Sequence, residues 1–205
     1  WPALGFGAAV WLIGAACADI FDRIALFKRP GQAWNRARGL PRSAWGAAIA
    51  HGGLGLTFAG IAGMGIATDT LVTLRPGQST QLAGYEWRLD GIRDVEGPNW
   101  TSRRATVTVL RGGTVVTVLE PERRHFPLAR THTTEAAIDT NWLRDLYAVK
   151  GEERDGGTIL RLHHNPLAPW IWLGAAIMAL GGGLSLSDRR MRVAAPRAKA
   201  AAGPA

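Results

Sequence analysis

The sequence predicts a membrane α-helical protein with three transmembrane helices and an all-β extracytoplasmic domain, a small barrel or sandwich. Two observations predict this fold class. Three stretches of the 205 residues, 1–18, 44–68 and 167–187, are nearly free of charge, and each is long enough for a helix to cross about 30 Å of hydrocarbon. Between the last two stretches, residues 69–166 are rich in Val and Thr and are punctuated by glycine turns, a pattern typical of short strands.

The three apolar stretches are expected to be helical, although they contain many glycines. A backbone in lipid must satisfy its own hydrogen bonds, and a helix does so within one segment. The single cysteine, Cys17, lies in the first stretch, so no disulfide can form within the chain. The chain begins with Trp1 in an apolar run, without a charged leader, and we interpret it as the C-terminal part of a longer protein.

The formal charge of +8 is unevenly distributed. Residues 69–166 are almost neutral, and the excess of Arg and Lys lies in residues 19–43 and 188–205. The positive-inside rule makes these flanks a basic cytoplasmic loop and a disordered cytoplasmic tail, with 69–166 on the opposite, periplasmic side. A nucleic-acid site would concentrate the charge on the folded domain instead, so we expect no nucleic-acid partner.

The clearest strand signal is a hairpin at residues 105–120, where a turn at 111–113 joins two Val- and Thr-rich runs. Residues 133–140 are predicted to be a helical turn or a loop. Further strands are expected at 70–74, 79–82, 85–89, 124–127, 145–149 and 158–163. The predicted core comprises Val107, Val109, Val116, Val118 and some of Trp87, Trp100 and Trp142.

The β domain is tied closely to the membrane at both ends. Asp69 follows the second apolar stretch at once, and Asn165-Pro166 leads directly into the third. Trp170 and Trp172, at the start of that stretch, suit the headgroup level of a bilayer. The domain is therefore expected to sit on the membrane surface and to contact lipid.

His51 lies about seven residues into the second apolar stretch. An ionisable side chain in a span is a functional candidate by default, and a neutral imidazole is a good axial haem ligand. Its helix face includes Gly55, Ala59 and Ala62, which would let a flat macrocycle approach. Three interpretations stay open: a hydrogen-bonded histidine between helices that pack through small residues, a haem ligand, or part of a proton or substrate path.

The remaining polar candidates lie in the β domain. The spacing of its four histidines matches no compact metal motif, so non-ligating roles are expected. Glu135, Asp139 and Asp145 lie near an arginine in sequence, which favours a salt bridge or a docking surface over acid–base chemistry. The four histidines are His125, His132, His163 and His164.

Several strings, taken in order, resemble the C-terminal end of the CcmF-type haem lyase subunit of bacterial cytochrome c maturation. The strings are Gly97-Pro98-Asn99-Trp100, Glu122-Arg123-Arg124, Thr134 to Asp139, Arg144-Asp145-Leu146-Tyr147, and Trp170 to Gly174 running on to Gly181-Gly182. The resemblance extends from the second apolar stretch nearly to the tail.

The resemblance implies a part in attaching haem to apocytochrome c at the outer face of the bacterial inner membrane. It implies that His51 ligates a resident haem b through its iron, with a second histidine from an upstream span. It also implies other maturation subunits, a haem chaperone and apocytochrome c as partners. The family's tryptophan-rich segment and outer histidines lie upstream of the matching region, so we assign no catalytic residue to this chain. The alternative is a non-enzymatic scaffold or transporter subunit whose outer domain docks a partner.

Overall fold

The computed structural model describes residues 1–154 and 156–188. Apart from its first residue, the tail predicted at 188–205 lies outside the described residues. The chain divides into two compact units, one formed by Trp1–Phe6 with Phe58–Trp172 and the other by Gly7–Thr57 with the residues from Leu173 onward. The first unit contains every described strand, and the second contains most of the helical residues.

Three helices of the described residues are long and apolar enough to cross a membrane, and together with a curled β-sandwich they confirm the predicted fold class. They are α1 (Pro2–Ile24), α3 (Arg42–Met64) and α4 (Ala168–Leu186). At 1.5 Å per residue the 23 residues of α3 extend about 35 Å, enough for a hydrocarbon core of about 30 Å.

A fourth helix, α2 (Pro30–Gly39), lies within the basic segment for which sequence patterning indicated only a loop. Pro30 stands in its first turn, where a missing N–H costs nothing. Ala33 is buried in a small cluster with Ile20 and Ile24 of α1. This packing explains why so short a helix forms in a polar sequence.

Helix α3 packs against α4 through glycines on both helices. A Cβ atom added to Gly53 would lie 2.7 Å from the carbonyl oxygen of Gly174, and one added to Gly181 would lie 2.5 Å from the backbone nitrogen of Ala50. By contrast, a Cβ atom on Gly182 would meet nothing within 4 Å. The glycines therefore allow close backbone approach, as small residues do in membrane helices.

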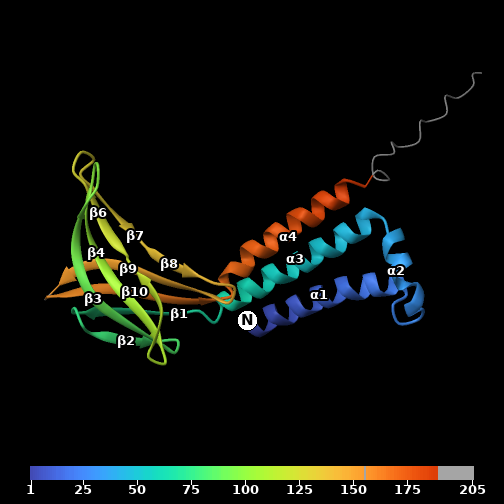
Figure 1. Ribbon diagram of the computed structural model, residues 1–205, viewed down its shortest axis with the longest axis horizontal. Helices are drawn as coiled ribbons and strands as arrows, with labels where there is room; N and C mark the ends of the chain where they lie inside the picture. Colours follow the sequence, from blue (N-terminus) through green and yellow to red (C-terminus); the bar gives the residue numbers. More distant parts are fainter. Residues whose placement is uncertain (155, 189–205) are drawn as a thin grey trace, which may run out of the picture. The chain divides into compact units, whose positions relative to one another are not determined.

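The β domain is a sandwich of two antiparallel sheets (Figure 1). One sheet has the order β1-β10-β9-β8, and the other has the order β2-β3-β4-β6-β7 with β5 paired to β4. The strands are β1 (Thr68–Leu74), β2 (Ser79–Leu82), β3 (Tyr85–Glu96), β4 (Thr101–Arg111), β5 (Thr114–Leu119), β6 (Glu122–Phe126), β7 (Thr131–Glu135), β8 (Ala137–Thr140), β9 (Arg144–Arg154) and β10 (Gly157–Pro166).

The core of the sandwich lies between the sheets, where alternate residues of the facing strands are fully buried. Trp87, Val107 and Val109 belong to the predicted core and are buried. They face Leu146 and Leu162, among others, from the opposite sheet. Residues 133–140 are not a helical turn or loop, as the sequence suggested, but parts of β7 and β8.

Val116 and Val118 are exposed, contrary to the prediction. Strand β5 carries an extra residue opposite β4, because Leu110 pairs with Val115 whereas Val109 pairs with Thr117. Since side chains alternate along a strand, this one-residue bulge turns the following residues to the other face. The core consequently receives Leu119 in place of the two valines. Trp142, also among the core candidates, is exposed in the turn between β8 and β9.

Candidate functional site

His51 lies in the third turn of α3, with its side chain exposed on that helix. Its Nδ1 atom is 2.7 Å from the carbonyl oxygen of Ala47, one turn earlier. A carbonyl oxygen only accepts, so this hydrogen bond selects the tautomer that carries its proton on Nδ1. The Nε2 lone pair is then free to accept a proton or to bind a metal ion, an arrangement common among metal-ligating histidines.

The small residues that follow His51 on α3 serve helix packing. A Cβ atom on Gly55 would lie 2.6 Å from the side chain of Ile13 in α1, and Ala59 and Ala62 are buried. The expectation that they leave room for a macrocycle is therefore wrong for these three positions. The neighbours of His51 one turn to either side, Ala47 and Leu54, are exposed and half-buried respectively.

The face of α3 around His51 fits a haem ligand chemically. A hydrophobic macrocycle needs an apolar surface, and its iron needs an uncharged nitrogen donor directed away from the helix. Ala47 and Leu54 supply accessible apolar surface, and the free Nε2 of His51 supplies the donor. A second axial ligand would have to come from another segment.

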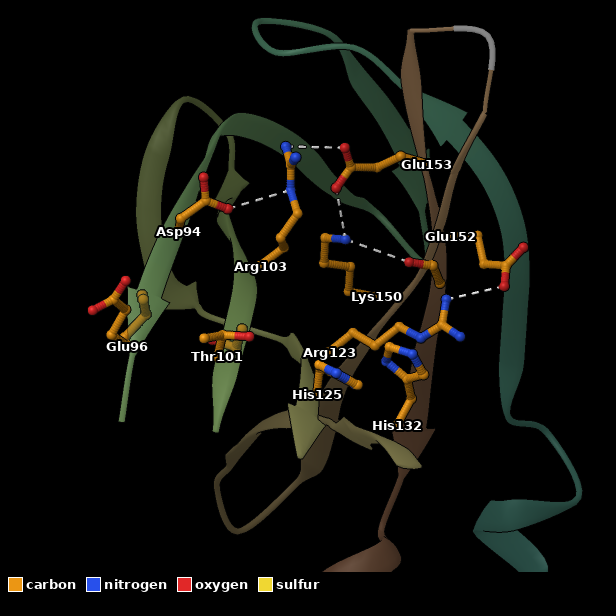
Figure 2. Close-up of a pocket in the computed structure, with 13 residues that line it drawn as sticks. Asp94, Glu96, Thr101, Arg103, Arg123, His125, His132, Lys150, Glu152 and Glu153 are labelled. Carbon is orange, nitrogen blue, oxygen red and sulfur yellow. Dashed lines mark hydrogen bonds and ion pairs between the residues drawn. The ribbon is translucent and has the colours of Figure 1, made fainter. Parts of the chain in front are cut away.

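A cleft of about 750 Å³ opens between the two sheets of the sandwich, lined by residues of β3, β4, β6, β7 and β9 (Figure 2). Its walls carry both signs of charge. Arg103 is 3.0 Å from Glu153 and 3.6 Å from Asp94, and Arg123 is 3.0 Å from Glu152. A cleft whose charges already pair with one another is suited to polar recognition more than to proton transfer.

Lys150, one of the residues that line this cleft, is nearly fully buried. It continues the inward-facing row of Leu146 and Ala148 on β9, and its Nζ is 3.0 Å from Glu153. An irregularity in the pairing of β9 with β10 places one residue of β10 opposite two of β9 just after Lys150. This bulge keeps Glu153 on the same face as Lys150 and so provides the buried ammonium with its partner.

His125 and His132 lie directly opposite each other on β6 and β7, and their ring centroids are 4.5 Å apart. Their separation of seven residues in sequence did not predict this pair; the hairpin between β6 and β7 creates it. The Nδ1 atom of His125 is buried without a hydrogen-bond partner. Within residues 1–154 and 156–188, no three His, Cys, Asp or Glu side chains are grouped as a metal site.

Glu122 is the centre of a buried ion-pair cluster between β4 and β6. Its carboxylate accepts hydrogen bonds from Arg104 at 2.7 Å, from Arg124 at 2.6 Å and from Ser102 at 2.9 Å. Burial alone would raise the pKa of Glu122, but these three donors outweigh it and hold the pKa below its usual value. The guanidinium of Arg124 also lies 4.4 Å from the centre of the Trp100 ring. Two of the sequence strings that carry the family resemblance, 97–100 and 122–124, are therefore in contact here.

A second cluster joins two more of the sequence strings that carry the family resemblance, Thr134 to Asp139 and Arg144 to Tyr147. Arg144 is almost fully buried and donates to the carboxylate and the carbonyl oxygen of Asp139, the latter at 2.9 Å. Its guanidinium also lies 5.6 Å from the centre of the Tyr85 ring. These contacts hold β8 against β9 and support the interpretation of these charges as a local salt bridge.

The adjacent histidines of β10 face different neighbours. His163 contacts the ring of Tyr147, and His164 contacts the ring of Tyr85. Burial is the main cause that lowers the pKa of each imidazole, and Arg144 and Arg111 lower that of His164 further. Burial therefore favours the neutral form of both imidazoles in the folded sandwich.

Residues 65–166 match the family model described as the CcmF C-terminal beta-sandwich. The chain is 44% identical over 200 residues to the cytochrome c-type biogenesis protein ccl1 of Rhodobacter capsulatus, a match that covers 95% of this chain and 30% of that protein. It is 38% identical over 191 residues to the cytochrome c-type biogenesis protein CcmF of Escherichia coli, covering 92% and 28%. The chain thus spans less than a third of the length of these relatives.

A solved structure entitled Cytochrome c Heme Lyase CcmF resembles the fold, with a TM-score of 0.59 and 22% identity over 71% of this chain and 25% of that one. Three helices are long and apolar enough to cross a membrane, and the sandwich between the second and the third matches a family model of cytochrome c assembly proteins, so the fold places the chain in that class. The chain belongs to the CcmF family of cytochrome c-type biogenesis proteins. The predicted resemblance is thereby confirmed.

Proposed function

We propose that this chain is the C-terminal part of a haem lyase subunit, in which His51 is an axial ligand of a resident haem b. The observation that carries the proposal is the hydrogen bond from Nδ1 of His51 to the carbonyl oxygen of Ala47, which leaves Nε2 free on an exposed face of α3. The family membership supports it, because relatives of this chain are named for cytochrome c biogenesis and haem lyase activity.

In this function His51 binds iron and the neighbouring apolar side chains exclude water from the macrocycle. The carbonyl oxygen of Ala47 fixes the tautomer and orientation of the imidazole, as outer hydrogen-bond partners do for other metal-binding histidines. The haem supplies a redox-active iron in the membrane. In this proposal a further ligand for the iron, and the residues that assist thioether formation between the haem vinyl groups and the cysteines of apocytochrome c, would come from parts of the protein upstream of this chain.

The sandwich has a separate role in the proposal. The charge distribution supports its location on the periplasmic side of the bacterial inner membrane, where apocytochrome c receives haem. There its charged cleft and exposed strands serve as a docking surface for another maturation subunit, the haem chaperone or apocytochrome c. This chain therefore combines a haem site in the membrane with a recognition domain outside it.

Haem content tests the proposal. The full-length protein should purify with haem b, and His51→Ala should lose most of that haem and regain it when imidazole is added. His125→Ala and His132→Ala are the matched controls and should keep the haem. A well-inserted His51→Ala protein of normal abundance with its full haem content would refute the assignment.

A further inference from the structure

The turn between β8 and β9 displays two large apolar side chains. Trp142 is 73% exposed and Leu143 is 66% exposed. The turn that carries them is well fixed, because the side-chain oxygen of Asn141 accepts the backbone N–H groups of Leu143 at 2.8 Å and of Arg144 at 2.9 Å. The exposure of both residues is therefore a defined feature of the sandwich.

This turn is hydrogen-bonded to the start of α4. The indole Nε1 of Trp170 donates a hydrogen bond to the carbonyl oxygen of Trp142 at 2.7 Å. The backbone N–H of Leu167 donates one to the carbonyl oxygen of Leu143 at 2.8 Å. Trp172, two residues further along α4, is also exposed. The two apolar side chains of the turn consequently lie at the level where α4 begins.

The exposed tip of the turn carries no charge that would oppose entry into a bilayer. Arg144, which follows the apolar pair, is buried and paired with Asp139. Aromatic side chains with one polar edge are favoured at the boundary between headgroups and hydrocarbon. Helix α4 is long and apolar enough to cross the membrane. Its first residues would then lie at the boundary between headgroups and hydrocarbon, and the turn that is hydrogen-bonded to them would lie at the same level.

We propose that Trp142 and Leu143 insert into the interfacial layer of the bilayer that α4 enters, and so anchor the sandwich by a contact separate from the chain connections. The partner is the lipid surface itself. The turn between β6 and β7 lies at the end of the sandwich away from the start of α4 (Figure 1). It offers an internal comparison, since Leu128 in that turn is 94% exposed.

Spin labelling of the full-length protein tests this proposal. Cys17 and any other native cysteines are replaced by serine, and a nitroxide is attached in Leu143→Cys or in the matched control Leu128→Cys. The protein is reconstituted in vesicles of phosphatidylethanolamine and phosphatidylglycerol. Collision rates with oxygen, which concentrates in lipid, and with a water-soluble nickel chelate are then compared.

The oxygen-to-nickel collision ratio should be at least about threefold higher at position 143 than at position 128, because oxygen partitions into the apolar layer. Trp142→Cys should give the same high ratio, which protects the result against a local distortion by one label. Equal ratios at 143 and 128 would overturn the proposal in favour of an aqueous turn. Low rates with both reagents at 143 would overturn it in favour of a protein that covers the turn.

Discussion

At the scale of single residues, Glu122 is a buried charge that stabilises the sandwich through its three donors. We expect Glu122→Gln to lower the free energy of unfolding of the domain by about 2 kcal/mol, since charged hydrogen bonds are lost in a buried place. The matched control Glu152→Gln removes an exposed carboxylate paired with Arg123 and should cost less than about 0.5 kcal/mol. Urea denaturation of residues 65–166 measures both, and equal losses would contradict the stabilising role of Glu122.

The same carboxylate predicts a pH dependence. The pKa of Glu122 is lower in the folded domain than its usual 4.5, so its contribution is complete above pH 4.5 and is lost as the pH falls toward the folded pKa. Glu122→Gln should therefore flatten the decline of stability below pH 4.5. An unchanged decline in the variant would show that other carboxylates are responsible.

His163 and His164 predict a second pH effect at a higher pH. Their folded pKa values lie below the usual 6.5, so the unfolded chain takes up protons first and the domain loses stability as the pH falls below 6.5. Replacing both residues by glutamine should reduce this loss, measured by urea denaturation at a pH about one unit above and one unit below 6.5. A slope equal to that of the unaltered domain would contradict the neutral state inferred for both.

At the scale of elements, the glycines between α3 and α4 can be tested by a pair of adjacent substitutions. Gly181→Ala should destabilise the full-length protein by about 2 kcal/mol, because its Cβ atom would clash with the backbone of α3. Gly182→Ala should be neutral or slightly stabilising, since alanine favours a helix and nothing lies nearby. Thermal unfolding in detergent compares the two, and similar melting temperatures would show that α3 and α4 do not pack as described.

Sequence patterning predicted the elements well where one physical rule dominates. Apolar length identified α1, α3 and α4, and alternation with glycine turns identified most strands. It placed Val116 and Val118 in the core because periodicity cannot reveal a one-residue bulge, which depends on pairing with β4. Helix α2 was missed because its stability comes from contacts of Ala33 with α1.

The candidate site was predictable only in part for a similar reason. An ionisable residue in an apolar run singles out His51 without any structure. Three other features depend on which segments meet in space. They are the packing of Gly55 against α1, the contact between the rings of His125 and His132, and the burial of Lys150. The sequence nevertheless contained a signal for the burial of Lys150, because it lies two residues after Ala148 and four after Leu146, at the same alternating positions of β9.

At the scale of the whole molecule, the sandwich has a hydrophobic core of its own. Residues 65–166 expressed alone should therefore fold and give a circular dichroism spectrum of β type, with a cooperative urea transition. We also expect the isolated domain to bind no haem b stoichiometrically, because the proposed ligand lies on α3. A mainly helical spectrum, or tight six-coordinate haem uptake, would contradict this division of roles.

The central claim is that His51 of the membrane helices ligates haem iron. Electron paramagnetic resonance of the oxidised full-length protein tests it most directly, by comparing the unaltered protein with His51→Met. A thioether in place of an imidazole changes the ligand field of the iron, so we predict that the g values shift while some haem is retained. Unchanged g values in a His51→Met protein that keeps its full haem content would contradict the claim.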